Sequence, residues 1–259
     1  MIVGIPKEIK NHEYRIGMTP AGVRELVNRG HQVLVENEGG VGVGFDNASY
    51  EKVGAQIVAS PEDIFAAADM IIKVKEPQPN ECRMLRPEQI LFTYLHLAPD
   101  PEQARLLLES GVSAIAYETV TNAKGGLPLL APMSEVAGRM SIQAGAHHLE
   151  KAQGGNGMLL GGVPGVEPAS VVVLGGGVVG TQAAKMAAGL GAQVTIFDRT
   201  IERLQQLDDL FQGRVVGLYS TQSAVEQYVR AADLVIGAVL IPGASAPKLV
   251  TRDDVAAMR

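Results

Sequence analysis

The sequence contains no tryptophan, one cysteine and few aromatic residues of any kind, which make up 4% of the chain. A single cysteine excludes a disulfide within the chain and is typical of a reducing compartment, so we expect a cytoplasmic location. No apolar run is as long as a bilayer span, and the first residues have the pattern of a strand rather than of a signal peptide. We therefore expect neither a secreted nor a membrane protein.

Basic residues are in the minority, because 22 Lys and Arg stand against 28 Asp and Glu. They are also scattered along the chain, so general nucleic-acid binding is not expected. What remains is an ordinary globular composition, with 46% hydrophobic and 19% charged residues. At 259 residues the chain exceeds one typical domain, and two domains are expected.

Short β patterns alternate with amphipathic helical patterns along the first half of the chain. Alternation of this kind predicts a parallel sheet covered by helices, which is an α/β fold. The expected strands are 2–5, 32–35, 56–58, 69–74, 89–95 and 113–116, and the expected helices are 20–28, 48–52, 61–67 and 101–110.

The most informative stretch is a buried-strand pattern, 171–174, that runs into a glycine-rich turn. Gly175, Gly177 and Gly180 match the G-x-G-x-x-G pattern of dinucleotide-binding folds. The first glycine permits the tight turn, the second lets a pyrophosphate approach the backbone, and the third permits close helix–strand packing. Helical signal follows at once, so the phosphates would lie at a helix N-terminus. We expect a Rossmann domain whose cofactor contacts include Gly175, Gly177, Val179 and Gly180.

An acidic residue follows the next predicted strand, 193–197. Asp198 comes 18 residues after Gly180, close to the spacing of about 20 expected for the carboxylate that binds the ribose hydroxyls. A carboxylate there repels a 2′-phosphate, although the basic neighbours Arg199 and Arg203 could accommodate one. NAD rather than NADP is the expected cofactor.

A long helix is predicted from about Ser134 to Gln153, after a passage rich in proline and glycine. Its alanine and glycine content suits a connector that packs closely between two domains. We expect a substrate or catalytic domain over 1–133, and over 134–259 the connector helix with the NAD-binding domain. Together they form two doubly wound α/β domains joined by a long helix.

The second domain is expected to be incomplete at its C-terminus. Only four strands can be counted in it, whereas such a domain normally has six. The last helical pattern, 251–258, has neither a C-cap nor a following strand.

Ligands of open α/β sheets bind beyond the carboxyl ends of the strands. In the first domain Lys75 and His96 follow two predicted strands, and Arg15 lies in the loop after the first strand. Arg15 would bind a small carboxylate, Lys75 would polarise an adjacent carbonyl, and His96 would act as general acid–base. Each could instead be an ordinary solvated or structural residue.

Other candidate sites are weaker. The glycine run 39–44 lacks a following long helix and a ribose-binding acid, so a second phosphate site is not expected there. His147 and His148 are adjacent on a predicted helix and point in different directions, so no metal site is expected. Ser134 could be a helix cap or a nicotinamide contact. Cys82 has no catalytic partner nearby and is interpreted as incidental.

Several motifs together resemble one enzyme family, that of the alanine dehydrogenases and the related transhydrogenase α subunits. The segments at two strand ends, 74–77 and 93–98, look specifically like alanine dehydrogenase. The resemblance covers the whole chain. The matching segments are Ile5–Asn11 with Glu13 and Arg15, Met18–Pro20, Val74–Pro77, Thr93–Ala98, and Gly162–Val166 leading into the glycine turn.

The resemblance implies reversible, NAD-dependent oxidative deamination of L-alanine to pyruvate and ammonium. Hydride would pass from the alanine Cα to nicotinamide C4, and water would add to the resulting iminium while His96 shuttles protons. By resemblance, Arg15 and Lys75 bind the substrate, and Arg203 approaches the phosphates or adenosine of the cofactor rather than selecting NADP. The family also implies a homo-hexamer. The cofactor-contact positions that it implies are Ser134, Val178, Asp198, Arg203, Ser220, Val239 and Leu240.

The resemblance further implies a catalytic Asp at the end of a strand beyond Arg259. Because that residue lies outside the chain, one alternative is a catalytically silent dinucleotide-binding fragment. A second alternative is the NAD-binding subunit of a membrane transhydrogenase. That subunit would need no substrate pocket, so Lys75 and His96 argue against it.

Overall fold

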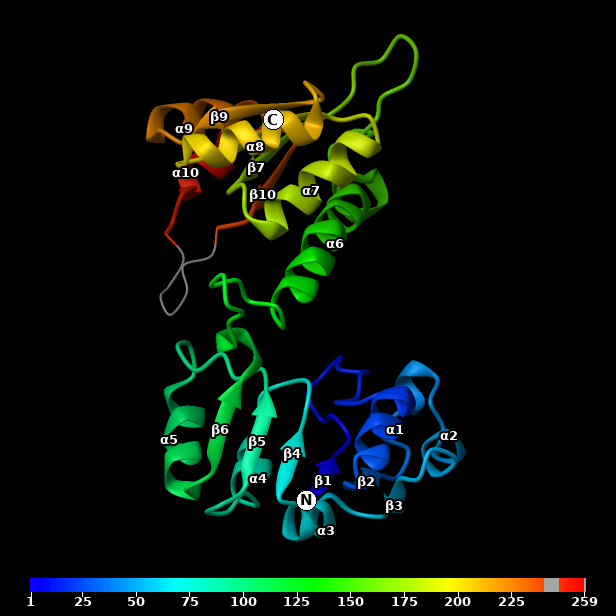
Figure 1. The fold of residues 1–259 in the computed structure, drawn as a ribbon. Coiled ribbons are helices and arrows are strands. Elements are labelled where there is room, and N and C mark those ends of the chain that lie inside the picture. The colour runs from blue at the N-terminus through cyan, green and yellow to red at the C-terminus, as the bar shows by residue number, and fades with distance from the viewer. Residues whose placement is uncertain (240–246, 259) are drawn as a thin grey trace. The chain divides into compact units, whose positions relative to one another are not determined.

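The computed structural model describes residues 1–239 and 247–258. The chain divides into two compact units, Met1–Leu129 (unit 1) and Leu130–Arg259 (unit 2). Each unit has its own sheet with helices packed beside it (Figure 1). The predicted α/β class is confirmed by these sheets, of six and four strands.

Unit 1 contains strands in the order β3-β2-β1-β4-β5-β6, and all neighbouring pairs are parallel. This is the common order of doubly wound sheets, in which the winding reverses between the first and the fourth strand. The switch point of unit 1 therefore lies between β1 and β4. The strands are β1 (Ile2–Ile5), β2 (Gln32–Glu36), β3 (Gln56–Val58), β4 (Met70–Ile72), β5 (Ile90–Thr93) and β6 (Ser113–Ala116).

Local sequence determines where the helices of unit 1 begin. Four N-cap side chains accept a hydrogen bond from a first-turn N–H, and three of these residues precede proline: Thr19, Asp46, Ser60 and Asp100. Gly111 closes one helix with φ of +69°. The helices are α1 (Pro20–Asn28), α2 (Asn47–Glu51), α3 (Pro61–Ala67), α4 (Pro79–Cys82) and α5 (Pro101–Ser110), with short 3-10 turns η1 (Val41–Val43) and η2 (Tyr117–Thr119).

The core of unit 1 covers both faces of its sheet. Successive side chains of a strand point to opposite faces. In β2, Leu34 belongs to one apolar cluster, while Val33 and Val35 belong to another. Because helices bury both faces, the residues at the carboxyl ends of the strands are left to form a site.

Unit 2 contains strands in the order β10-β7-β8-β9, again all parallel. This matches the first four strands of the same doubly wound order. The four strands counted from the sequence are therefore the four found in the described part of the unit. They are β7 (Ser170–Leu174), β8 (Gln193–Asp198), β9 (Val215–Tyr219) and β10 (Leu234–Gly237).

The helices of unit 2 pack on this sheet and on one another. A Cβ on Gly138 would lie 2.2 Å from the carbonyl oxygen of Val179, so α6 and α7 pack backbone against backbone (Figure 1). The helices are α6 (Ala131–Leu149), α7 (Val178–Gly189), α8 (Ile201–Phe211), α9 (Gln222–Ala231) and α10 (Arg252–Ala256), with a 3-10 turn η3 (Lys151–Gln153). No helix within residues 1–239 and 247–258 has the length and apolarity to cross a membrane.

The predicted bounds of the long helix are wrong at both ends. It begins at Ala131 rather than Ser134, because Pro132 lies in its first turn, where a missing N–H costs nothing. It ends at Leu149, and the last residues predicted as helix form the 3-10 turn. Ser134 is thus inside the helix, and its predicted alternative role as a cap is wrong.

The strands that precede Lys75 and His96 are shorter than predicted. β4 ends at Ile72 and β5 at Thr93, so both candidate residues lie in loops rather than directly at strand ends. The four-residue helix α4 is unexpected, because the sequence of this segment has the character of a polar loop. In the glycine run 39–44, three residues form the η1 turn.

Candidate functional site

The three candidate substrate residues lie at one edge of the sheet in unit 1. Arg15 is in the loop after β1, Lys75 in the loop after β4, and His96 in the loop after β5. Because all the strands are parallel, their carboxyl ends meet at the same edge. Arg15 and Lys75 flank the switch point, and His96 is one strand further along.

Arg15 is held by a carboxylate to which the sequence alone assigns no functional role. Nε of Arg15 donates to Oε1 of Glu13 at 2.8 Å, and Nη2 donates to Oε2 at 2.6 Å. The backbone N–H of Arg15 also donates to Oε1, at 2.9 Å. Hydrogen bonding to Glu13 raises the pKa of Arg15, against the opposing effect of burial. A substrate carboxylate would therefore share Arg15 with Glu13.

Glu13 links Arg15 to Lys75. Hydrogen bonds from Arg15 lower the pKa of Glu13, and the positive charge of Lys75 lowers it further. Both cations thus lower the pKa of the same carboxylate. Within the described residues, the Lys75 ammonium has no hydrogen-bond or ion-pair partner, so it is available to a ligand.

A pocket of about 250 Å³ opens beside Arg15 and Glu13. Part of its wall is the glycine run, where a Cβ on Gly42 would lie 2.8 Å from the carbonyl oxygen of Tyr14. Glycine there lets the two loops approach closely, which gives the run a packing role. The described lining residues are Lys7, Glu8, Glu13, Tyr14, Arg15, Glu38, Gly39, Val41 and Gly42, so Lys75 and His96 do not line this pocket.

His96 has an unusual backbone conformation. Its φ is +48°, in the left-handed region that residues other than glycine seldom adopt. Glu118 holds it there, because Oε1 accepts from the backbone N–H of His96 at 2.6 Å and from that of Leu95 at 3.1 Å. Strained residues of this kind persist where the surroundings fix them, and they are common at active sites.

The imidazole of His96 is exposed and faces two polar neighbours. Its ring stacks on Tyr94 with centroids 5.9 Å apart and planes 4° from parallel. Nδ1 lies 3.9 Å from Oε1 of Glu118. Burial raises the pKa of Tyr94, and the positive charge of Arg15 opposes that rise. Tyr94 is therefore a partner of His96, and the sequence does not reveal it because aromatic residues near strand ends usually pack in the core.

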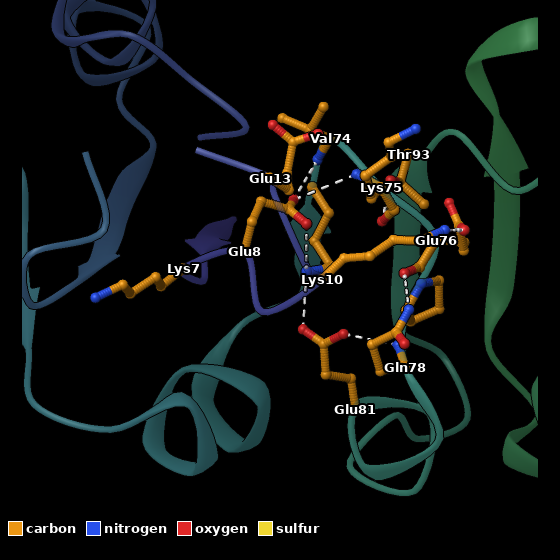
Figure 2. Close-up of polar contacts among 12 residues, drawn as sticks. Lys7, Glu8, Lys10, Glu13, Val74, Lys75, Glu76, Gln78, Glu81 and Thr93 are labelled. Atoms are coloured by element: carbon orange, nitrogen blue, oxygen red, sulfur yellow. Dashed lines mark hydrogen bonds and ion pairs between the residues drawn. The ribbon is translucent and has the colours of Figure 1, made fainter. Parts of the chain in front are cut away.

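A second group of charges is buried beneath Lys75, and the sequence does not reveal it either. Lys73 is fully buried, with Nζ 2.8 Å from Oε1 of Glu81 and 3.2 Å from Oε2 of Glu8. Oε1 of Glu8 accepts from the backbone N–H of Val74 at 2.6 Å and of Lys75 at 3.3 Å (Figure 2). The only sign of this group in the sequence is a lysine inside an apolar strand pattern. That pattern does not indicate which residues the lysine pairs with.

In unit 2 the glycine turn has the geometry expected of a phosphate-binding loop. Gly175 has φ of +108°, and a Cβ on Gly180 would lie 1.8 Å from the carbonyl oxygen of Gly175, so neither position admits a side chain. No described atom lies within 4 Å of a Cβ built on Gly177. Packing within the chain therefore explains the first and third glycines but not the second, and the space at Gly177 fits a bound pyrophosphate.

The first turn of α7 carries no side-chain cap. Its N-cap is Gly177, and the helix has no acidic residue in its first turn. The first N–H groups of a helix have no partner within it and favour an anion. The residues present thus fit the diphosphate of a dinucleotide.

Asp198 and Arg203 hold the glycine turn from either side. Oδ2 of Asp198 accepts from the backbone N–H of Gly176 at 2.8 Å. Nε of Arg203 donates to the carbonyl oxygen of Gly176 at 2.7 Å, and Nη2 donates to Oγ1 of Thr181 at 2.7 Å. Arg203 therefore lies against the turn, beside the expected cofactor position.

Of the remaining expected cofactor contacts, two lie beside residues of the glycine turn or of its supporting acid. The N–H of Ser220 donates to the carbonyl oxygen of Asp198 at 2.9 Å, and Val239 lies beside Gly175, with its Cγ2 3.0 Å from a Cβ built there. Ser134 is half-buried in the first turn of α6. Leu240 lies outside the described residues.

Two of the weaker candidates have ordinary surroundings. Nδ1 of His147 lies 3.6 Å from Oε2 of Glu150, the residue that follows α6. Cys82 is buried, and burial raises the pKa of its thiol to about 11. That shift keeps the thiol protonated at neutral pH and unreactive.

The chain matches the two domain models of one known family, one after the other along the sequence. Residues 4–137 match the model described as "Alanine dehydrogenase/PNT, N-terminal domain". Residues 141–259 match "Alanine dehydrogenase/PNT, C-terminal domain".

Individual relatives extend this match over the whole chain. An "Alanine dehydrogenase" of Halomonas elongata is 58% identical over 259 residues, which are 100% of this chain and 70% of that protein. A solved structure of "L-alanine dehydrogenase" is 54% identical with a TM-score of 0.93, over 100% of this chain and 72% of that one. A transhydrogenase from Sinorhizobium meliloti is 27% identical with a TM-score of 0.83, over 100% of this chain and 76% of that one.

Proposed function

The chain belongs to the alanine dehydrogenase/PNT family, and from this premise we propose that it is an L-alanine dehydrogenase. Its cofactor is a pyridine nucleotide. The proposed reaction is L-alanine + NAD⁺ + H₂O ⇌ pyruvate + NH₄⁺ + NADH + H⁺. The bound nicotinamide supplies the hydride chemistry, and the protein supplies binding, orientation and charge.

The glycine turn of unit 2 would hold the cofactor. Gly177 leaves room for the pyrophosphate, and the N-terminus of α7 offers it N–H groups. Asp198 ends β8, where its carboxylate would accept from the two ribose hydroxyls while keeping its bond to Gly176. A 2′-phosphate would be repelled by that carboxylate, which supports NAD as the specific cofactor. Ser134, Ser220 and Val239 would contribute further contacts.

The edge residues of unit 1 would hold the substrate. Arg15 would bind the carboxylate of alanine or pyruvate, with Glu13 fixing the guanidinium in orientation. Lys75 would donate to the carbonyl oxygen of pyruvate. It would also donate to the hydroxyl that the added water leaves on the same carbon before the carbonyl forms. His96 would take a proton from the water that adds to the substrate and return it to the departing amine nitrogen, and Glu118 would stabilise the protonated ring.

One observation carries this proposal beyond the family assignment: Arg15, held by Glu13, and Lys75 lie in the loops that follow the two strands at the switch point of unit 1. A subunit that only exchanges hydride between nucleotides would need no such site. The transhydrogenase alternative is also less supported by similarity, at 27% identity against 54% for the dehydrogenase structure.

The direct test is alanine-dependent reduction of NAD by the 259-residue chain, followed by the absorbance of NADH. We expect turnover in the wild type and its loss in His96→Ala. His148→Ala is the matched control, because His148 is exposed on α6 and distant in sequence from every proposed substrate residue. Equal turnover in both variants would contradict the role of His96.

Cofactor binding is measured separately from catalysis. The chain has no tryptophan, so a rise in NADH fluorescence reports the bound nucleotide directly. NADH binding without alanine turnover would support the silent-fragment alternative, and neither binding nor turnover would contradict the proposed function.

We also propose a cytoplasmic homo-hexamer. The single buried cysteine is compatible with a reducing compartment. Light scattering during size-exclusion chromatography would give the mass of the assembly, and a value other than six chains would contradict this part of the proposal.

A further inference from the structure

We propose that Glu8 is a positioning residue for Lys75: buried between the Lys73 ammonium and the Val74–Lys75 backbone, its carboxylate fixes where the Lys75 side chain begins. The inference rests on the proposed function in one respect, that Lys75 contacts the substrate. The geometry around Glu8 does not depend on that role. The readouts that need no catalysis do not depend on it either.

Both carboxylate oxygens of Glu8 contact groups in the segment that follows β4. Its side chain is 1% exposed, although it comes from the loop after β1, 65 residues before Lys73. One oxygen, Oε1, accepts from the N–H groups of Val74 and Lys75, and the other, Oε2, faces Nζ of Lys73 at 3.2 Å. A carboxylate that accepts backbone N–H groups is a strong and directional anchor.

The opposite side of the Lys75 peptide is anchored as well. Oγ1 of Thr93, a buried residue of β5, donates to the carbonyl oxygen of Lys75 at 2.8 Å. Glu8 in the loop after β1 and Thr93 on β5 therefore hold Lys75 by its N–H and its C=O. The side chain of Lys75 begins at this fixed peptide, and its positive charge lowers the pKa of Glu13.

Lys73 and Glu81 complete the arrangement. Glu81 is 3% exposed, and its Oε1 lies 2.8 Å from Nζ of Lys73. Its other oxygen, Oε2, accepts from the backbone N–H of Gln78 at 2.8 Å (Figure 2). The segment from Val74 to Gln78 is thus held at both ends by carboxylates that share one buried ammonium.

Stability alone does not account for these charges. A buried ion pair is often no more stabilising than apolar residues of similar volume, because removing charges from water is costly. What charges add is geometry, since one oxygen of Glu8 accepts from the N–H groups of Val74 and Lys75 and one oxygen of Glu81 accepts from that of Gln78. The backbone fixed in this way is the one that carries Lys75.

Two substitutions at Glu8 separate the anchor from the charge. Glu8→Gln keeps an amide oxygen for the N–H groups of Val74 and Lys75 but removes the charge that faces Lys73. Glu8→Ala removes both. A third variant, Thr93→Val, removes the anchor on the carbonyl side of Lys75 without altering any buried charge, so it tests the idea even if Glu8→Ala fails to fold.

The matched control is Asp69→Ala. Asp69 also accepts a backbone N–H of the same sheet, that of Ile2 at 2.6 Å, but it precedes β4 and lies at the opposite end of the strands. It should therefore reproduce the general effect of losing a carboxylate–backbone contact without moving Lys75.

The first readouts need no catalysis. Amide hydrogen exchange at Val74 and Lys75 should accelerate by roughly tenfold or more in Glu8→Ala and remain near wild type in Glu8→Gln. Acylation of the Lys75 amine, mapped by mass spectrometry against exposed Lys52 as internal reference, should accelerate in Glu8→Ala and in Thr93→Val. Asp69→Ala should change neither.

The kinetic readout distinguishes positioning from folding. Displacement of Lys75 should raise KM for alanine and lower kcat/KM by roughly 100-fold in Glu8→Ala, with partial recovery in Glu8→Gln. NADH affinity should be unchanged. A merely structural role would lower the folded fraction, and hence kcat, at an unchanged KM.

The outcomes are separable. Unchanged exchange and acylation at Lys75 in both Glu8→Ala and Thr93→Val would overturn the positioning role. Altered exchange and acylation with an unaffected KM for alanine would leave the positioning intact and contradict the proposed role of Lys75 in substrate binding.

Discussion

The two units share one winding order but use the switch point differently. In unit 1 the strands adjacent to it, β1 and β4, are followed by loops rich in charge, which bring Glu8, Arg15 and Lys75 together. In unit 2 the corresponding strand, β7, runs directly into a glycine turn and a helix N-terminus. The same sheet topology therefore offers side chains in one unit and backbone N–H groups in the other, and function follows from those loops rather than from the fold.

The units also differ in what fixes their loops. In unit 1, buried or half-buried carboxylates accept backbone N–H groups: Glu8 those of Val74 and Lys75, and Glu118 those of Leu95 and His96. In unit 2 the carboxylate of Asp198 likewise accepts from the N–H of Gly176, but the close packing of the turn depends on the absence of side chains at Gly175 and Gly180. Unit 1 should accordingly be sensitive to loss of charge, and unit 2 to the addition of a single carbon.

The largest effect is expected for that single carbon at Gly180. A Cβ there would lie 1.8 Å from the carbonyl oxygen of Gly175, so backbone must move. Gly180→Ala should lower the free energy of unfolding by about 3 kcal/mol or more, measured by urea denaturation. Gly177→Ala is the control, because its Cβ meets no described atom, and its stability should match wild type within about 1 kcal/mol. Similar losses in both variants would contradict the assigned roles of the two glycines.

The next effect is expected at the buried lysine of unit 1. Lys73→Met leaves Glu8 and Glu81 buried beside each other without their shared ammonium. The free energy of unfolding should fall by about 3 kcal/mol, since an uncompensated buried charge remains. Lys10→Met is the comparison, because the Lys10 side chain is 40% exposed although its partner Glu76 is only 14% exposed, and it should cost less than Lys73→Met. Equal losses would mean that Lys73 is not the centre of the buried network.

The smallest effect concerns the pH dependence of unit 1. Arg15 holds the pKa of Glu13 below its usual value of 4.5 in the folded chain. The folded state therefore binds fewer protons, and the stability that Glu13 contributes is present above pH 4.5 and lost as pH falls through its folded pKa.

Glu13→Gln should flatten the fall of the unfolding free energy with decreasing pH in that acidic range. Glu25→Gln, at an exposed position of α1, should keep the wild-type slope. An unchanged slope in Glu13→Gln would show that the Glu13–Arg15 pair does not form in solution.

The sequence predicts unit 2 better than unit 1, for a physical reason. A phosphate-binding turn is local, so Gly175, Gly177 and Gly180 define it within six residues. Asp198, the acid that supports the turn, ends the next strand. A single helix sets its distance in sequence from the turn. The structure has the predicted strand, turn and helix in that order.

The substrate edge of unit 1 is assembled from distant segments, and much of it could not be predicted. Lys73 looks like a solvated lysine in a strand until Glu8, 65 residues away, is placed beside it. Glu118 fixes the backbone of His96 from 22 residues further along the chain, and no local pattern indicates the left-handed conformation that results. Such partners are set by sheet order, which a single sequence expresses only weakly.

The most direct test of the division between the units is an NADH fluorescence titration of three chains: wild type, Gly177→Ala and Arg15→Met. We predict that Gly177→Ala weakens NADH binding by roughly tenfold or more, because its Cβ enters the space of the pyrophosphate. Arg15→Met should bind NADH as the wild type does. Unchanged affinity in Gly177→Ala, or an equal loss in Arg15→Met, would contradict the assignment of cofactor to unit 2 and substrate to unit 1.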